Sequence, residues 1–219
     1  MVRKAYIKQI DYYLPADVVS NEDIVTDFPE WSVEKIARKV GVNKRHVASK
    51  NETASDLAIK AAERLFGKGE VSRDEIDYVL FCTQSPDYFL PTSACIIQDK
   101  LGLRRNIGAL DFNLGCSGYV YGLSLAKGLI SCGVANSVLL LTGETYNKHL
   151  HPKDKGNRTI FGDAASATVI STNGISEIGD FSLGTDGSGA DNLIVRSGGM
   201  RIPEKRCDLS FDENNNPVS

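Results

Sequence analysis

The 219-residue sequence predicts a layered α/β fold with a mostly parallel, buried sheet. Two observations lead to this prediction. The run 78–82 is apolar without alternation, which is typical of a strand that is covered on both faces. Segments with strand character alternate along the chain with segments of helical periodicity. Such alternation indicates right-handed crossovers between strands of one layered sheet.

The elements follow from periodicity and from residues that start or stop helices. Thr53 and Asp56 resemble a capping box, and apolar residues at helical spacing follow as far as Gly67. Pro91 can open a later helix, and Gly41 can end an early one. The expected strands cover 5–10, 78–82, 107–112, 137–141 and 164–170, and the expected helices cover 32–39, 53–67, 91–102 and 117–130.

The helix expected after Cys116 has an unusual composition. Gly118, Gly122 and Ala126 recur at every fourth position and form a stripe of small side chains, while leucine and isoleucine occupy its other faces. A helix that is apolar nearly all round is typically buried. Because the small stripe lets another backbone approach closely, we expect this helix to be central in the fold.

Composition excludes several function classes. The chain carries 25 basic and 28 acidic residues, a formal charge of −3, so nothing indicates a nucleic-acid-binding face. No apolar run is long enough to span a membrane, and the first residues lack a secretion signal. The five cysteines show no CxxC spacing, so we expect reduced thiols, no metal site and a cytoplasmic location.

We expect one domain over 1–205 and a polar tail over 206–219. Residues 212–217, DENNNP, are polar, and the tail ends without a terminating element. We interpret it as the place where a longer protein is cut.

Cys116 is the candidate nucleophile. It falls where a buried strand ends and a buried helix begins, and glycines at 115 and 118 permit a sharp turn. Free backbone N–H groups and the helix dipole favour a thiolate at such a position. A thiolate is both a nucleophile and a leaving group, which suits thioester exchange.

A buried packing cysteine is the alternative from position alone, and structural roles are expected for Cys82, Cys95, Cys132 and Cys207. A cysteine–histidine hydrolase would need His149 or His151 beside Cys116.

Four segments in order resemble the 3-oxoacyl-(acyl-carrier-protein) synthase III family of thiolase-fold condensing enzymes. Residues 111–118, DFNLGCSG, are similar to the family's nucleophile segment. The other three are GVNKRH at 41–46, NRTIFGDAA at 157–165 and LGTDGSGAD at 183–191. The resemblance runs from about Ala5 to Pro203. It implies one half of the duplicated thiolase-like architecture.

The resemblance also implies an activity. Cys116 would accept an acyl group from acyl-CoA, and malonyl-(acyl carrier protein) would then lose CO2 and attack the enzyme thioester. The backbone N–H of Cys116 would be one donor to the oxyanion. The implied partners are an acyl carrier protein, an acyl-CoA and a second copy of the chain in a homodimer, and no cofactor is implied. Leu90 matches the family loop that closes the acyl pocket across the dimer.

Two features depart from the family pattern. The family's catalytic His and Asn come from the second half of its chain, so we expect this chain alone not to complete the condensation. The family often holds the CoA adenine between a tryptophan and an arginine. An ungapped alignment puts Lys35 and Lys155 at those positions, and we expect Trp31 to be a packing residue. Lysines can bind phosphates but do not stack as flat groups do.

Two alternatives remain from the sequence. One is a thiolase-fold relative with a different acyl substrate, such as a hydroxymethylglutaryl-CoA synthase. The other is a non-catalytic scaffold half-module in which Cys116 is merely buried.

Overall fold

The computed structural model describes residues 3–203, 210–211 and 217–218. The chain consists of two compact units, residues 1–181 and residues 182–219. The second unit contains a short 3-10 helix, Gly187–Asn192, and the paired strands β9 (Ser210–Phe211) and β10 (Pro217–Val218). Most of the tail predicted at 206–219, including Cys207, lies outside the described residues.

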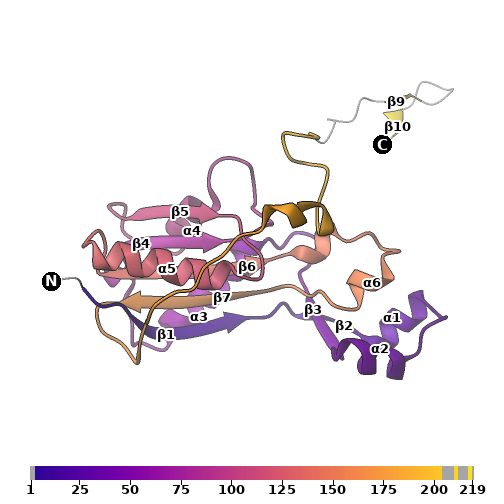
Figure 1. The fold of residues 1–219 in the computed structure, drawn as a ribbon, viewed down its shortest axis with the longest axis horizontal. Helices are drawn as coiled ribbons and strands as arrows, with labels where there is room; N and C mark the ends of the chain where they lie inside the picture. The colour runs from indigo at the N-terminus through magenta and orange to yellow at the C-terminus, as the bar shows by residue number, and fades with distance from the viewer. Residues whose placement is uncertain (1–2, 204–209, 212–216, 219) are drawn as a thin grey trace. The chain divides into compact units, whose positions relative to one another are not determined.

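A six-stranded sheet in the order β5-β4-β6-β7-β1-β8 forms the centre of the first unit (Figure 1). Strands β5, β4 and β6 pair in parallel, whereas the ladders β6–β7, β7–β1 and β1–β8 are antiparallel. Four strands, β5, β4, β6 and β1, therefore run in one direction, and β7 and β8 run in the other. The predicted α/β sheet is confirmed, with its parallel part at the β5 side. The strand bounds are Tyr6–Tyr13 (β1), Tyr78–Cys82 (β4), Gly108–Phe112 (β5), Ser137–Glu144 (β6), Ala164–Ser171 (β7) and Ser176–Glu177 (β8).

Helices cover the two faces of this sheet. α3 (Ala54–Gly67) and α4 (Ser93–Lys100) pack on one face, and α5 (Gly118–Ser131) packs on the other (Figure 1). The capping box predicted at Thr53 is present, since its hydroxyl accepts from the backbone N–H of Asp56 and the Asp56 carboxylate accepts from that of Thr53. Neighbouring residues of β4 alternate between the faces: Val79 and Phe81 face α3, and Leu80 faces α5.

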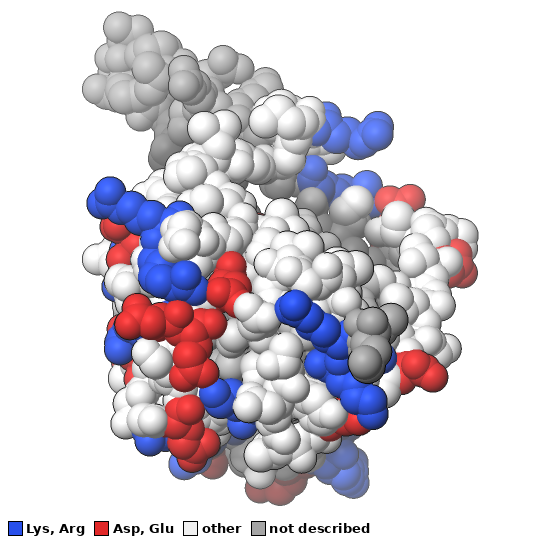
Figure 2. Space-filling view, turned by 90° about the vertical axis from the view of Figure 1, so that its left-hand side faces the viewer, with Lys and Arg blue, Asp and Glu red and all other residues white. Residues whose placement is uncertain are grey.

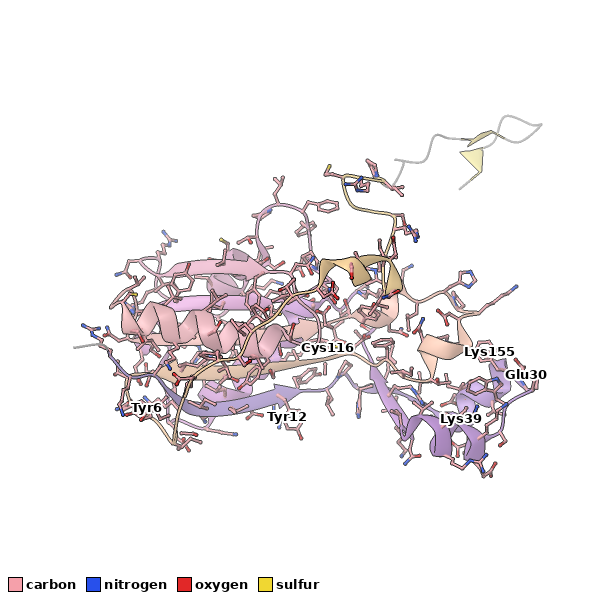
Figure 3. The ribbon with its side chains drawn as sticks, in the orientation of Figure 1. Tyr6, Tyr12, Glu30, Lys39, Cys116 and Lys155 are labelled. Carbon is pink, nitrogen blue, oxygen red and sulfur yellow. The ribbon has the colours of Figure 1, made fainter. Side chains whose placement is uncertain are left out.

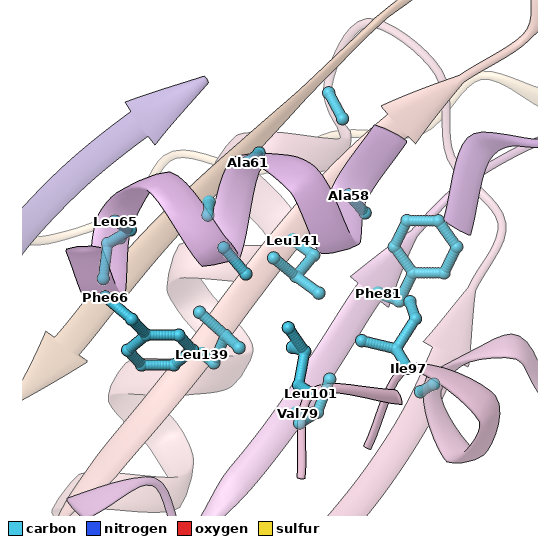
Figure 4. Close-up of a cluster of buried hydrophobic side chains, with 14 of the residues drawn as sticks. Ala58, Ala61, Leu65, Phe66, Val79, Phe81, Ile97, Leu101, Leu139 and Leu141 are labelled. Carbon is cyan, nitrogen blue, oxygen red and sulfur yellow. The ribbon is translucent and has the colours of Figure 1, made fainter. Parts of the chain in front are cut away.

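The larger hydrophobic cluster lies between α3, α4 and the sheet (Figure 4). Alanines along α3 bring its backbone close to the strands, and fully buried leucine and phenylalanine side chains fill the remaining space. Each such side chain contributes roughly 1.5–3 kcal/mol by leaving water. This packing gives the parallel strands a rigid support, so that the loops at their ends have fixed positions.

A small subdomain extends from one end of the sheet (Figure 1). It contains the hairpin of β2 (Asp17–Ser20) and β3 (Lys44–Val47), together with α1 (Asn21–Asp27) and α2 (Val33–Val40). The helix predicted at 32–39 is confirmed as α2, capped by Ser32 and ended by Gly41 at φ 76°. Ile24, Phe28 and Ile36 form its own small core. α6 (Lys155–Arg158) lies at the same end of the molecule.

The prediction that the helix after Cys116 is buried all round is wrong for this chain. The small stripe is buried against the sheet: a Cβ on Gly122 would stand 2.6 Å from Leu140 Cδ1. The opposite side of α5 is open, with Val120 45% and Leu125 42% exposed. Among residues 3–181, none covers this side fully.

Charges of both signs share the surface. On the face that the left end of Figure 1 presents, acidic and basic side chains lie next to each other (Figure 2). The two longest helices, α3 and α5, have 14 residues each, and none of the helices among the described residues could cross a membrane.

Candidate active site

Three loops meet at one edge of the sheet. β4 lies between its two parallel neighbours, β5 and β6. Its last residue, Cys82, is opposite Phe112 of β5 on one side and Thr142 of β6 on the other. The segments that follow these strands therefore leave the sheet side by side. This carboxyl edge of parallel strands is the usual place for ligands in open α/β sheets.

Cys116 lies in the turn between β5 and α5, as the sequence predicts. The N–H of Gly118 donates to the carbonyl of Gly115 at 2.8 Å, which makes a tight turn with Cys116 exposed at its bend. Ser117, at the N-cap, makes no side-chain cap hydrogen bond. In Figure 3 Cys116 lies at the end of α5 that faces the small subdomain. The positive end of a 14-residue helix thus lies beside an accessible thiol. The catalytic role of this thiol remains a prediction.

A second cysteine, Cys82, packs against this turn from the end of β4. The Cys82 thiol, at the end of β4, donates to the carbonyl of Leu114 at 3.2 Å. A Cβ on Gly118 would lie less than 3.0 Å from the Cys82 sulfur, so glycine lets α5 begin directly against this thiol. Burial raises the pKa of Cys82 to about 11, which keeps the thiol protonated and able to donate. The structural role expected for Cys82 is confirmed.

A half-buried carboxylate joins the β4 and β6 loops. Glu144, the last residue of β6, accepts from the backbone N–H of Gln84 and from the Ser85 hydroxyl, both at 2.7 Å. The Ser85 oxygen in turn accepts from the N–H of Thr145 at 2.9 Å. Burial raises the pKa of Glu144, and the hydrogen bonds oppose that rise. The two loops are thereby tied together next to the Cys116 turn.

Asp111 connects the nucleophile segment to the loop that carries Leu90. Its carboxylate accepts from the N–H groups of Ser93 and Ala94 at 2.6 and 2.7 Å, so a residue of β5 caps α4. Thr92, the N-cap residue in sequence, makes no side-chain cap bond. Leu90 precedes a cis bond to Pro91, and its side chain is 83% exposed. Leu90 therefore does not line a closed pocket within a single chain.

The lysines placed at the adenine positions surround Trp31. Lys35 Nζ lies 5.1 Å and Lys155 Nζ 6.0 Å from the centre of the Trp31 ring, and Lys155 also pairs with Glu30 at 2.7 Å. Lys155 and Glu30 adjoin in Figure 3. Trp31 packs on the small core, which confirms its packing role. The structure also puts the Trp31 ring beside Lys155, while the alignment of Lys35 with the family's tryptophan remains a prediction.

A pocket of about 220 Å³ opens near the small subdomain. Arg45 and Arg158 contribute cations to a lining that is otherwise mainly apolar. Arg45 is buried and donates to the carbonyl of Thr159 and to Asn21 Oδ1, the latter at 2.8 Å. Burial lowers the pKa of Arg45. The lining residues are Val19, Ile24, Arg45, Val47, Asn147, Leu150, Pro152, Arg158 and Phe161.

The remaining candidates lie apart from this network or play other roles. Cys95 and Cys132 are exposed on α4 and at the end of α5. His149 packs edge-on against Tyr146, with ring centres 5.7 Å apart. Asp163 of the FGD segment is buried and accepts from the N–H groups of Ala48 and Asn147, so this segment ties loops together. Within residues 3–203, no cluster of three or more His, Cys, Asp or Glu side chains is placed to hold a metal ion.

Sequence reasoning missed Gln84, Ser85 and Glu144. The signal available was positional: each lies two or three residues after an apolar strand run. Such residues converge where parallel strands end, but their meeting depends on β4 lying between β5 and β6, an order that periodicity does not reveal.

Part of the chain that contains this site matches a family model. Residues 110–187 match the family model of 3-oxoacyl-[acyl-carrier-protein (ACP)] synthase III. That range contains the last three residues of β5, the Cys116 turn, α5, β6 and the FGD segment.

Relatives match over most of this chain. A β-ketoacyl-[acyl-carrier-protein] synthase III of Chlamydia caviae is 38% identical over 92% of this chain and 60% of its own length. A crystal structure of a 3-oxoacyl-(acyl-carrier-protein) synthase III is 50% identical, with a TM-score of 0.89 over 97% of this chain and 64% of that one. The synthase structure from Burkholderia xenovorans is 37% identical, with a TM-score of 0.83 over 93% and 58%. This chain thus spans about three fifths of the length of these relatives.

Proposed function

We propose that this chain, which is similar to 3-oxoacyl-[acyl-carrier-protein] synthase III relatives over most of its length, carries an acyl group on Cys116 for condensation with malonyl-(acyl carrier protein). One observation carries the proposal: an accessible thiol lies at the amino end of α5, at the carboxyl edge of parallel strands. A thiol placed there is suited to thioester exchange.

In the first step, the Cys116 thiolate attacks the carbonyl carbon of an acyl thioester. A tetrahedral oxyanion forms, and backbone N–H groups at the turn, that of Cys116 among them, stabilise it by donating hydrogen bonds. The C–S bond to the donor then breaks, CoA leaves as a thiolate, and the acyl group stays on the Cys116 sulfur.

In the second step, malonyl-(acyl carrier protein) loses CO2, and the resulting carbanion attacks the Cys116 thioester. The products are a 3-oxoacyl-(acyl carrier protein), longer by two carbons, and the free thiol. The family's His and Asn would stabilise the enolate. We assign the acyl-transfer step to this chain and the complete condensation to a protein that also supplies those two residues.

We propose that acyl-CoA is the donor and that Trp31 provides the flat face for its adenine. The neighbouring lysines, Lys35 and Lys155, would meet the nucleotide phosphates. Trp31→Leu should weaken acyl-CoA labelling of Cys116 by up to about tenfold, since one aromatic stack contributes roughly 0.5–1.5 kcal/mol. Labelling by an acyl N-acetylcysteamine thioester, which has no adenine, should not change. Equal losses for both donors would contradict this placement of CoA.

We also propose a homodimer through the β5 edge. β5 pairs with β4 alone in the sheet, and the adjacent loop presents Tyr88, Phe89 and Leu90 to solvent. An unpaired edge beside an apolar loop is suited to a second copy of the chain. Leu90 would then close the acyl pocket of the partner. Leu90→Asp should shift sedimentation toward the monomer and leave the far-UV circular dichroism spectrum unchanged, whereas a dimer of undiminished stability would contradict this role.

The direct test is mass spectrometry after incubation with butyryl-CoA. We expect one butyryl group on the peptide containing Cys116, released by neutral hydroxylamine and absent from Cys116→Ala. Cys95 and Cys132 are exposed in the same protein and serve as internal controls. If Cys116 stays free while these cysteines react, the proposed function is wrong.

A further inference from the structure

The Gln84 side chain lies against the nucleophile turn. Its Oε1 atom is 2.9 Å from the position that a Cβ on Gly115 would take, and its Cδ and Nε2 atoms are 3.5 and 3.8 Å from that position. The carboxamide therefore fills the place of a side chain at residue 115, immediately before Cys116. The same side chain is exposed to solvent, so an incoming group can reach it.

The backbone of Gln84 is held in place from β6. Its N–H donates to Glu144 Oε1 at 2.7 Å, and the other carboxylate oxygen accepts from Ser85 at 2.7 Å. Glu144 ends a strand that pairs along its whole length with β7 and through residues 138–142 with β4. The carboxamide thus extends from a backbone that is fixed at two neighbouring residues. A side chain that starts from a fixed backbone can discriminate between ligands, because less binding free energy is spent on ordering it than on a side chain of a mobile loop.

We infer that Gln84 is a specificity-determining residue that selects for acyl groups with a hydroxyl or carbonyl oxygen beyond the thioester. This inference rests on the proposed function, since it concerns the group carried by Cys116. The carboxamide supplies two N–H donors and an acceptor oxygen. A polar acyl group can pair with them, whereas an alkyl group displaces water from the carboxamide and leaves it without a partner. One such hydrogen bond corresponds to a preference of about threefold to tenfold.

The test uses two methanethiosulfonates of nearly equal size, the 2-hydroxyethyl and the propyl reagents. A cysteine thiolate attacks the sulfenyl sulfur of either reagent, forms a mixed disulfide and releases methanesulfinate. The rates at Cys116 are followed by peptide mapping, and the rates at Cys95 and Cys132 correct for the intrinsic difference between the reagents. We expect the corrected hydroxyethyl-to-propyl ratio at Cys116 to fall by about threefold to tenfold in Gln84→Leu. A ratio that is the same in both proteins would overturn the inference.

A second arm uses the proposed substrates. Competition between 3-hydroxybutyryl-CoA and butyryl-CoA should favour the hydroxylated group on Cys116, and Gln84→Leu should remove that preference. Labelling by both substrates without any preference would contradict the role of Gln84 and leave the proposed function standing. If neither substrate labels Cys116, the proposed function fails, and the methanethiosulfonate ratio still decides whether Gln84 contacts groups on this sulfur.

Discussion

The contact between Cys82 and Gly118 allows a quantitative test of how the nucleophile turn is supported. In Gly118→Ala the new Cβ would lie less than 3.0 Å from the Cys82 sulfur, a separation that real Cβ atoms essentially never show. Overpacking of this kind costs about 1–3 kcal/mol. The better helix propensity of alanine offsets at most about 1 kcal/mol of that cost. We therefore expect the free energy of unfolding to fall by about 1–2 kcal/mol.

Removing the sulfur should restore the fit. Cys82→Ala alone leaves a small cavity and should cost about 1 kcal/mol. In the double variant the methyl group introduced by Gly118→Ala occupies the space of the missing sulfur, so the two losses should not add. We expect a favourable coupling free energy of about 1–3 kcal/mol between the two substitutions.

The assay is urea unfolding of the four proteins in the double-mutant cycle, with Cys116 labelling by butyryl-CoA as a second readout. Gly128→Ala is the matched control, because it lies on the same helix and its Cβ would meet nothing within 4 Å. This control should be neutral or stabilising. Additive losses in Gly118→Ala and Cys82→Ala would refute the packing argument.

Two further predictions concern ionisable groups, and one concerns the cap of α4. Because the pKa of Glu144 is raised in the folded protein, its contribution to stability is full below its ordinary pKa and is lost as pH rises through the raised value. Urea unfolding between pH 4 and 8 should therefore show a smaller loss of unfolding free energy in Glu144→Gln than in the parent. The same pH dependence of that free energy in both proteins would contradict this. With a pKa of about 11, only about one Cys82 thiol in a thousand is ionised at pH 8, so Cys82 should resist iodoacetamide. The exposed thiols of Cys95 and Cys132 should react under the same conditions. Alkylation of Cys82 at their rate would disprove its burial. Asp111→Asn should cost about 1 kcal/mol and speed amide hydrogen exchange at Ser93 and Ala94, whereas unchanged exchange there would show that the cap is dispensable.

The elements predicted best are those whose local sequence and burial agree. The run 78–82 is β4 to the residue, and Thr53 caps α3 as expected. The hairpin of β2 and β3 was missed because its strands have four residues each, too few to show a period. α1 was missed although Ser20 and Asp23 form a capping box, because only seven residues follow the cap.

The site was predicted only as far as local sequence determines it. Cys116 could be located because glycines, a strand and a helix flank it in the chain. Gln84 and Glu144 are 60 residues apart, and their contact depends on the pairing of β4 with β6. The exposure of the outer side of α5 could not be predicted for a different reason. Its apolar residues predict burial, but burial also requires a covering element, which local composition does not specify.

The most direct test of the central claim is the rate at which Cys116 accepts an acyl group from butyryl-CoA, compared with the rates at the other exposed cysteines of the same protein. If the turn at the amino end of α5 activates this thiol, acyl transfer to Cys116 should be much faster than transfer to Cys95 and Cys132. Equal rates at the three thiols, or no adduct on Cys116, would contradict the assignment of Cys116 as the acyl carrier.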